Sequence, residues 1–235
     1  MAYVDGFVAA VPAADKDAFR KHAEQAAALS REFGASRHVE TWGDDVPEGK
    51  VTDFRRAVQA REDEVVVFSW LEYPDKAARD ACMARMRDDP RPAAVAMPFD
   101  GARVIYGGFT PIVDQGTAGE GGYVDGFLVP VPAANKDAYR DLAARAAEVF
   151  RKHGALRVME AWGDDVPDGK VTDLKRAVKA DGDAVVFSWI EWPSKAVRDE
   201  GWTKTMADPL MQDGSNPPFD GGRMVYGGFE LVLDV

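Results

Sequence analysis

The chain contains one sequence twice. Residues 1–114 recur as residues 123–235 at an offset of 120 positions, which slips to 119 after Arg61 and returns to 120 before Pro98. Matching segments are Tyr3–Phe7 with Tyr123–Phe127, Trp42–Pro47 with Trp162–Pro167, Lys50–Asp53 with Lys170–Asp173, Phe68–Trp70 with Phe187–Trp189, Pro98–Gly101 with Pro218–Gly221, and Tyr106–Phe109 with Tyr226–Phe229. Repeated sequence indicates repeated structural units. We therefore predict two domains, 1–114 and 123–235, joined by a Gly-rich linker at 115–122 that is flexible by composition.

Each copy has the pattern of a β-α-β-β-α-β unit. In copy one the strands are expected over residues 3–11, 36–42, 65–73 and 103–113, and the helices over residues 15–33 and 75–87. Residues 54–60 fit either a short helix or an edge strand. Asp15 and Asp75 are the expected N-caps of the two helices. This order predicts an α+β, ferredoxin-like fold with helices on one face of an antiparallel sheet.

The other face of the sheet is expected to be apolar. Phe68, Trp70 and Glu72 alternate along one strand and therefore share a face. Large exposed apolar patches are rare in monomers, so this face needs a partner. The second copy supplies one, and we predict tandem ferredoxin-like repeats that form an intramolecular dimeric α/β barrel.

The segments YVDGF, WGDDVP, GKVTDF, VVFSW, PFDG and YGGF resemble those of the DUF1428 family, whose members carry them in a single copy. The resemblance covers nearly all of both repeats. It implies the dimeric α/β-barrel superfamily, and it supplies no established activity. Because this chain holds two copies, the resemblance implies a pseudo-dimer built into one chain.

Charge and composition exclude several classes of partner. Asp and Glu outnumber Lys and Arg by 40 to 29, which gives a net charge of −11 and opposes binding to nucleic acid or anionic membranes. No apolar run approaches the roughly 20 residues of a membrane span. The N-terminal residues lack the basic region of a secretory signal. With a single cysteine, Cys82, no internal disulfide can form, and a cytoplasmic location is expected.

No pattern of metal or cofactor ligands is present, so we expect no cofactor and no metal. The histidines are isolated, and the other copy fills each equivalent position with an apolar residue, which favours packing or surface roles. These histidines are His22, His38 and His153, and their counterparts are Leu142, Val158 and Phe33. The loop 43–50 lacks the ligand spacing of a calcium loop or a phosphate loop, so a solvated pair of turns is expected there.

Carboxylates and aromatic residues in phase along the strands form the candidate ligand site. They are expected to face a cavity between the two sheets, where a buried carboxylate has a raised pKa and acts as a base or binds a polar group. Alternatively, the carboxylates pair with Arg37, Arg56 or Arg103 and fix the interface between the copies. The candidate residues are Asp5, Phe7, Glu40, Trp42, Trp70, Glu72 and Tyr106 in copy one, and Asp125, Phe127, Glu160, Trp162, Trp189, Glu191 and Tyr226 in copy two.

Three functions fit these features. The first is a binding protein that holds a small apolar or aromatic molecule between the sheets. The second is a cofactor-independent enzyme, such as a monooxygenase or isomerase, that uses the inward carboxylates; the sequence assigns no catalytic residue. The third is a structural pseudo-dimer with a filled barrel.

Overall fold

The computed structural model describes residues 1–119, 121–212 and 216–235. Copy one comprises β1 (Tyr3–Pro12), α1 (Lys16–Phe33), β2 (Arg37–Asp45), α2 (Phe54–Ala57), β3 (Glu64–Tyr73), α3 (Lys76–Asp88), α4 (Pro90–Ala94) and β4 (Ile105–Gly116). Copy two comprises β5 (Tyr123–Val131), α5 (Lys136–Lys152), β6 (Arg157–Asp165), α6 (Leu174–Ala177), β7 (Ala184–Trp192), α7 (Lys195–Ala207) and β8 (Val225–Asp234). Short 3₁₀ turns lie at Ala13–Asp15, Gly101–Arg103, Ala133–Asn135, Pro209–Met211 and Gly221–Arg223. The predicted β-α-β-β-α-β order is confirmed in both copies, with a short helix at 54–57.

Local sequence signals explain where the helices begin and end. The Asp75 carboxylate accepts a hydrogen bond of 2.8 Å from the Ala78 amide and caps α3, as predicted. Asp15 is the N-cap residue of α1, as predicted, but its side chain makes no capping hydrogen bond. Helix α1 ends at Gly34, whose φ of 123° is one that residues with a side chain rarely adopt.

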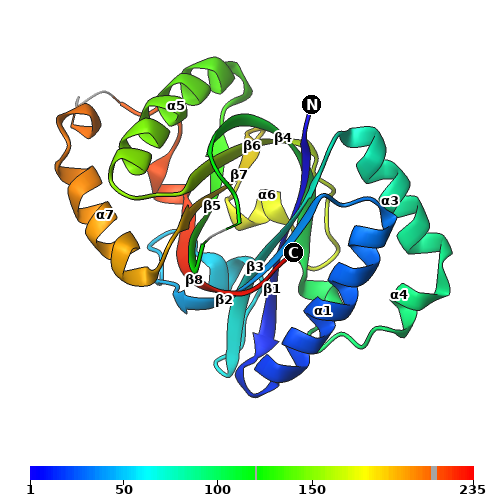
Figure 1. Ribbon diagram of the computed structural model, residues 1–235. Coiled ribbons are helices and arrows are strands. Elements are labelled where there is room, and N and C mark those ends of the chain that lie inside the picture. Colours follow the sequence, from blue (N-terminus) through cyan, green and yellow to red (C-terminus); the bar gives the residue numbers. More distant parts are fainter. Residues whose placement is uncertain (120, 213–215) are drawn as a thin grey trace.

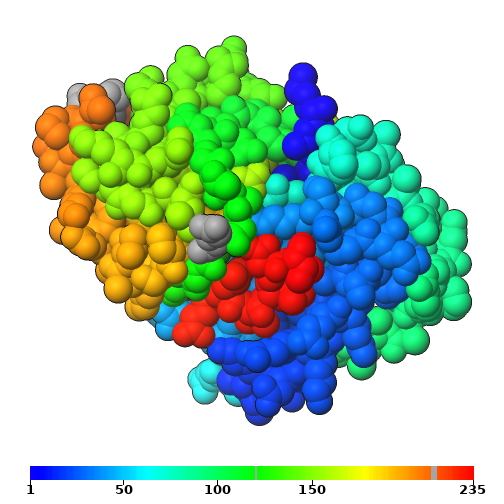
Figure 2. Space-filling model, in the orientation of Figure 1, coloured from blue at the N-terminus to red at the C-terminus, as the bar shows by residue number. Residues whose placement is uncertain are grey.

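The described strands form one closed barrel in the order β1-β3-β2-β8-β5-β7-β6-β4 (Figure 1). Within each copy the four strands pair antiparallel, and the last strand of each copy also pairs with the other copy, β4 with β6 and β8 with β2. In Figure 2 the red β8 lies against blue residues of copy one. The two sheets therefore join at both edges, and the helices of the two copies flank opposite sides of the barrel.

The expected linker begins later in the structure than in the prediction. Strand β4 continues through Gly116, which pairs with Arg157 of β6. A Cβ atom at Gly116 would lie 2.0 Å from the carbonyl oxygen of Leu156, and its φ is 113°, so the strand passes this point only with glycine. Residues 115 and 116 therefore belong to the barrel, and residue 120 lies outside the described residues.

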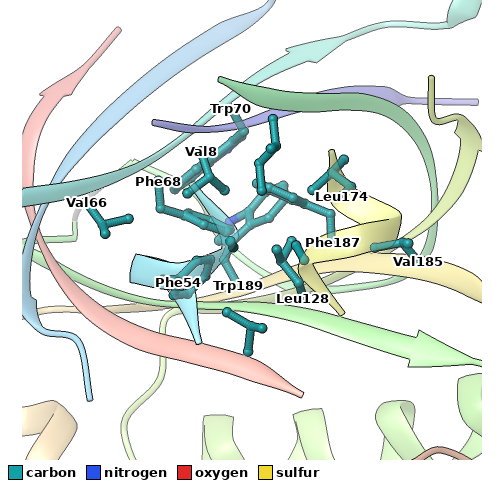
Figure 3. Close-up of a cluster of buried hydrophobic side chains, with 14 of the residues drawn as sticks. Val8, Phe54, Val66, Phe68, Trp70, Leu128, Leu174, Val185, Phe187 and Trp189 are labelled. Carbon is teal, nitrogen blue, oxygen red and sulfur yellow. The ribbon is translucent and has the colours of Figure 1, made fainter. Parts of the chain in front are cut away.

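Side chains from both copies fill the interior of the barrel (Figure 3). Phe68 stacks on Phe187 with ring centroids 4.3 Å apart, and Trp70 stacks on Trp189 at 4.4 Å. Each pair joins equivalent residues of the two copies, so the pseudo-twofold axis passes between the rings. A Cβ atom at Gly6 would lie 2.6 Å from the Phe187 ring, so β1 has no room for a larger residue there.

A buried ion cluster closes one end of this core. Both terminal nitrogens of Arg37 donate to Glu191, at 2.8 and 2.9 Å, and Arg37 also binds Asp234 at 2.7 and 2.8 Å. The indole of Trp189 donates to the same Glu191 at 3.0 Å. The arrangement repeats with Arg157, Glu72 and Asp114. The alternative in which carboxylates pair with Arg37 between the copies is therefore confirmed.

The Asp residues of the repeated WGDDVP segments also join the copies. Asp44 accepts a hydrogen bond of 2.9 Å from the Tyr123 hydroxyl and pairs with Lys195. Asp45 pairs with Arg198 at 2.9 Å, and copy two makes the mirrored contacts from Asp164 and Asp165. The expectation of a merely solvated turn is wrong for this part of the loop, because these carboxylates bind the opposite copy.

We predict that Glu191→Gln destabilises the protein by about 1–3 kcal/mol, because a neutral amide with one acceptor oxygen replaces a buried carboxylate that accepts two hydrogen bonds from Arg37 and one from the Trp189 indole, while Asp234 still pairs with Arg37. Urea denaturation followed by tryptophan fluorescence measures the change. Glu200→Gln is the matched control, since Glu200 is exposed on α7 and pairs with the exposed Lys204, and the loss of stability should stay within about 0.5 kcal/mol. Equal effects of the two substitutions would contradict the prediction.

We also predict that residues 1–116, expressed alone, form a stable dimer, because β4 of one molecule can pair with β2 of another as it now pairs with β6. Two identical copies satisfy this contact by a twofold axis. Sedimentation velocity at micromolar concentration tests it, and a folded monomer would refute it.

Candidate functional site

The structure divides the predicted site residues between the two faces of the sheets. Trp70, Glu72, Trp189 and Glu191 face the barrel interior, as expected, but they are part of its packed core and ion cluster. The prediction of a cavity between the sheets is wrong, because aromatic rings occupy that space. The other residues lie on the strand positions that face the helices: Asp5, Phe7, Glu40, Trp42 and Tyr106, with Asp125, Phe127, Glu160, Trp162 and Tyr226.

The reason lies in β1. The side chains at positions 4, 6, 8 and 10 of this strand face the interior, where small residues leave space for the rings of β3 and β7. Asp5 therefore lies beneath α3, where it accepts from Arg79 at 2.9 Å. Burial raises the pKa of Asp5 to about 6, and the ion pair with Arg79 opposes the rise. Trp42 packs against Phe19 of α1 with centroids 5.7 Å apart.

A cavity of about 590 Å³ lies on the helix side of the sheet of copy one. Three of the predicted residues, Phe7, Glu40 and Tyr106, line it from the sheet, and the remainder of its wall comes from further residues of β1, β2 and β3, from α1 and α3, and from the segment before β4. The additional wall residues are Ala9, Phe19, His22, Ala26, His38, Val67, Ser69, Leu71, Met86, Met97, Phe99, Gly101 and Val104. Most of these side chains are apolar.

A row of hydrogen-bonded polar groups forms part of this apolar wall. Ser30 Oγ lies 2.8 Å from His38 Nδ1, and His38 Nε2 lies 2.9 Å from Glu40 Oε1. The Ser69 hydroxyl donates to the other carboxylate oxygen, Oε2 of Glu40. All four residues are buried. Buried polar groups require such partners, and here they hold the carboxylate in one orientation.

Part of the cavity wall comes from the segment before β4, through Met97, Phe99, Gly101 and Val104, and His22 links this segment to α1. His22 Nδ1 donates to the Ala96 carbonyl oxygen at 3.0 Å, and its ring meets Phe99 edge-on at 5.2 Å. Met97 and Tyr106 remain largely exposed at this end of the site. His22 and His38 were expected to have only packing or surface roles. Both instead line the cavity, and the sequence signal was their absence from copy two.

Copy two fills the equivalent space with its own side chains. Tyr139 replaces Phe19, and its hydroxyl donates to Glu160 at 2.7 Å. The indole of Trp202 donates to Asp125 at 2.7 Å, and its ring lies 4.8 Å from that of Phe150. Phe150 and Val158 stand where copy one has Ser30 and His38. The two copies therefore share a fold and differ at this site.

Family comparison agrees with this duplicated architecture. The model of DUF1428, a protein family of unknown function, matches residues 2–101 and again residues 122–221. The chain belongs to the DUF1428 family. Uncharacterized protein YbaA of Escherichia coli (strain K12) is 60% identical over 114 residues, which cover 97% of YbaA and 48% of this chain. Thus this DUF1428 chain carries two matched regions, and YbaA aligns with about half of it.

Solved structures with the same fold have little sequence in common with this DUF1428 chain. A "putative monooxygenase" of Fusobacterium nucleatum is 8% identical, with a TM-score of 0.63 over 99% of this chain and 93% of its own. One from Lactobacillus acidophilus is 11% identical, with a TM-score of 0.61 over 100% and 95%. An anthrone oxidase-like protein is 10% identical, with a TM-score of 0.56 over 100% and 92%. At these identities the likeness shows the barrel fold alone.

Within residues 1–119, 121–212 and 216–235, no helix combines the length and the hydropathy that crossing a bilayer requires. Over the same residues, no three His, Cys, Asp or Glu side chains are grouped in a way that could hold a metal ion.

The pKa of Glu160 gives a test of this contrast between the copies. Burial raises it to about 7, and the hydrogen bonds from Tyr139 and Ser188 oppose the rise. Because the folded pKa exceeds the unfolded value of about 4.5, Glu160 stabilises the fold at low pH, and this contribution is lost as the pH rises towards 7. We predict that raising the pH from 5 to 8 lowers the free energy of unfolding of both proteins, and that the decrease is smaller in Glu160→Gln than in the wild type. The difference between the two decreases should be at most about 3 kcal/mol. Urea titrations at both pH values measure it, and identical pH dependence would contradict it.

Proposed function

We propose that this protein binds a small, mainly apolar molecule in the cavity of copy one. The observation that carries the proposal is the buried His38–Glu40–Ser69 row in an otherwise apolar wall. Ligand sites commonly combine an apolar lining with a few fixed polar groups, and their volumes run from about 300 to 1,000 Å³. The cavity of about 590 Å³ fits that description.

The chemistry of the wall limits the class of ligand. Phe7, Phe19 and Leu71 offer apolar surface to a ring system. Glu40 offers a fixed oxygen acceptor, so a hydroxyl group or an acidic C–H group of the ligand would meet it. A net charge of −11 disfavours a polyanionic ligand or partner. We therefore favour an uncharged aromatic or alicyclic molecule with one polar group.

One structure with this barrel fold is called anthrone oxidase-like, and anthrone is a fused-ring aromatic ketone. That name belongs to the other protein, whose identity to this chain is 10%. It supports the use of bicyclic aromatic phenols and ketones as test ligands, and 2-naphthol is the simplest fluorescent one.

We predict that the double substitution Phe19→Tyr with Met83→Trp weakens 2-naphthol binding at least about tenfold, or roughly 1.4 kcal/mol. These residues stand where copy two has Tyr139 and Trp202, so the substitutions add a hydroxyl beside Glu40 and an indole beneath α3. Fluorescence titration of 2-naphthol gives the dissociation constants.

The reverse change in copy two is the matched control. Tyr139→Phe with Trp202→Met alters a similar amount of side chain but leaves the cavity of copy one untouched, so binding should stay within about twofold of the wild type. Equal weakening by both pairs of substitutions, or no saturable binding by the wild type, would contradict the proposal.

A further inference from the structure

We infer that the His38–Glu40 pair is a proton-transfer site, in which Glu40 takes a proton from a carbon atom next to the carbonyl group of a cyclic ketone and returns it. This inference rests on the proposed binding in the same cavity and names its substrate class. The geometry of four hydrogen-bonding groups carries it.

The first step is the position of the protons at Ser30. The Ser30 hydroxyl carries one hydrogen and lies within reach of two acceptors, the Ala27 carbonyl oxygen at 3.1 Å and His38 Nδ1 at 2.8 Å. When the hydroxyl donates to Ala27, His38 Nδ1 must carry a hydrogen of its own to bond with Ser30. When the hydroxyl turns to His38, Nδ1 accepts and carries none.

The second step follows at the other nitrogen of the ring. His38 Nε2 lies 2.9 Å from Glu40 Oε1. A hydrogen bond between these two atoms requires one hydrogen, carried either by the nitrogen or by the oxygen. With Nδ1 bare, the ring is neutral, Nε2 supplies that hydrogen and Glu40 is an ionised carboxylate. With Nδ1 protonated, a hydrogen must still lie between Nε2 and Oε1, so the His38–Glu40 pair holds one proton more than it does with Nδ1 bare.

The pair therefore has two complete arrangements that differ by one proton. In both of them the contacts from Ser30 to His38 and from His38 to Glu40 are kept, and the Ser69 hydroxyl continues to donate to Oε2. The two arrangements differ at the Ser30 hydroxyl, which donates to the Ala27 carbonyl oxygen in one and to His38 Nδ1 in the other. A group that gains or loses a proton without losing its partners suits general acid–base catalysis.

The surroundings favour chemistry at this carboxylate. The titratable groups in the cavity wall are His22 from α1, Tyr106 from β4 and the His38–Glu40 pair itself from β2. Among the described residues that form the wall, α3 contributes Met86, the segment before β4 contributes Met97 and Phe99, and no lysine or arginine is present. Glu40 thus meets a bound ligand without a competing cation.

The reaction requires no second reactant. The C–H bond breaks as the Glu40 O–H bond forms, and the electron pair of the C–H bond forms the C–C double bond of the enolate, whose oxygen carries the charge. Return of the proton to the same carbon restores the ketone, and return to another carbon of a conjugated system isomerises it. Glu40 is the catalytic residue, and His38 is a positioning residue that holds Glu40 Oε1 through Nε2.

The experiment follows exchange of the α-hydrogens of 2-tetralone in D₂O by proton NMR, with the intact protein over a range of pH. We expect the wild-type rate to exceed the buffer rate and Glu40→Gln to lower it about 100-fold or more, the usual scale of a general base. His38→Val, which copies Val158 of copy two, should lower the rate about tenfold and change the shape of the pH–rate profile. Glu160→Gln should stay within about twofold.

Binding is measured in the same samples from line broadening of 2-tetralone and by fluorescence titration of 2-naphthol, and folding is checked by thermal denaturation. Tetralone that binds the wild type without exchange, or exchange that survives in a folded Glu40→Gln, overturns the proton-transfer inference and leaves the binding proposal standing. Failure of both probes to bind overturns the binding proposal as well. A slower His38→Val with an unchanged pH profile refutes the role given to His38.

Discussion

Contact between equivalent aromatic rings on the pseudo-twofold axis determines much of this structure. Phe68 on Phe187 and Trp70 on Trp189 fill the centre of the barrel, and Gly6 and Gly126 are small because those rings lie against them. The ion cluster of Arg37 with Glu191 lies next to the Trp189 indole and closes one end of the same core. With the interior filled, space for a ligand exists on the other face of the sheet, beneath the helices.

Duplication within one chain lets the two copies differ at that face. In a homodimer of a single-copy relative, any substitution appears at both sites. Here copy one has His38 and Ser30 beside Glu40, whereas copy two has Val158 and Phe150 beside Glu160. The barrel core is nearly symmetric and the helix-side cavities are not, so the shared core supplies the fold while the site has diverged.

The fold could be predicted from the sequence because its determinants repeat. The offset of 120, the strand and helix order and the apolar face of β3 together specify a pseudo-dimeric barrel. The phase of β1 could not be predicted, since Val4 and Val8 suit either face and the requirement at Gly6 comes from Phe187, a residue of the other copy. Glu40 was identified as a site residue for its alternation with Trp42, although the strand presents it to α1 and not to the interior. His38 was set aside because its counterpart is Val158, yet that difference marks the site.

The same difference bears on why copy one keeps these polar groups. A buried row of serine, histidine and carboxylate needs every hydrogen bond satisfied, and an apolar core of similar shape is usually at least as stable. Copy two shows that this fold accepts the apolar alternative, since Phe150 and Val158 pack there without disturbing the strand pairings. Stability alone therefore gives no reason for His38 and Ser30 in copy one. Residues that depart from the local packing solution without a structural gain are characteristic of functional sites, and in this chain those residues adjoin the cavity that retains a carboxylate.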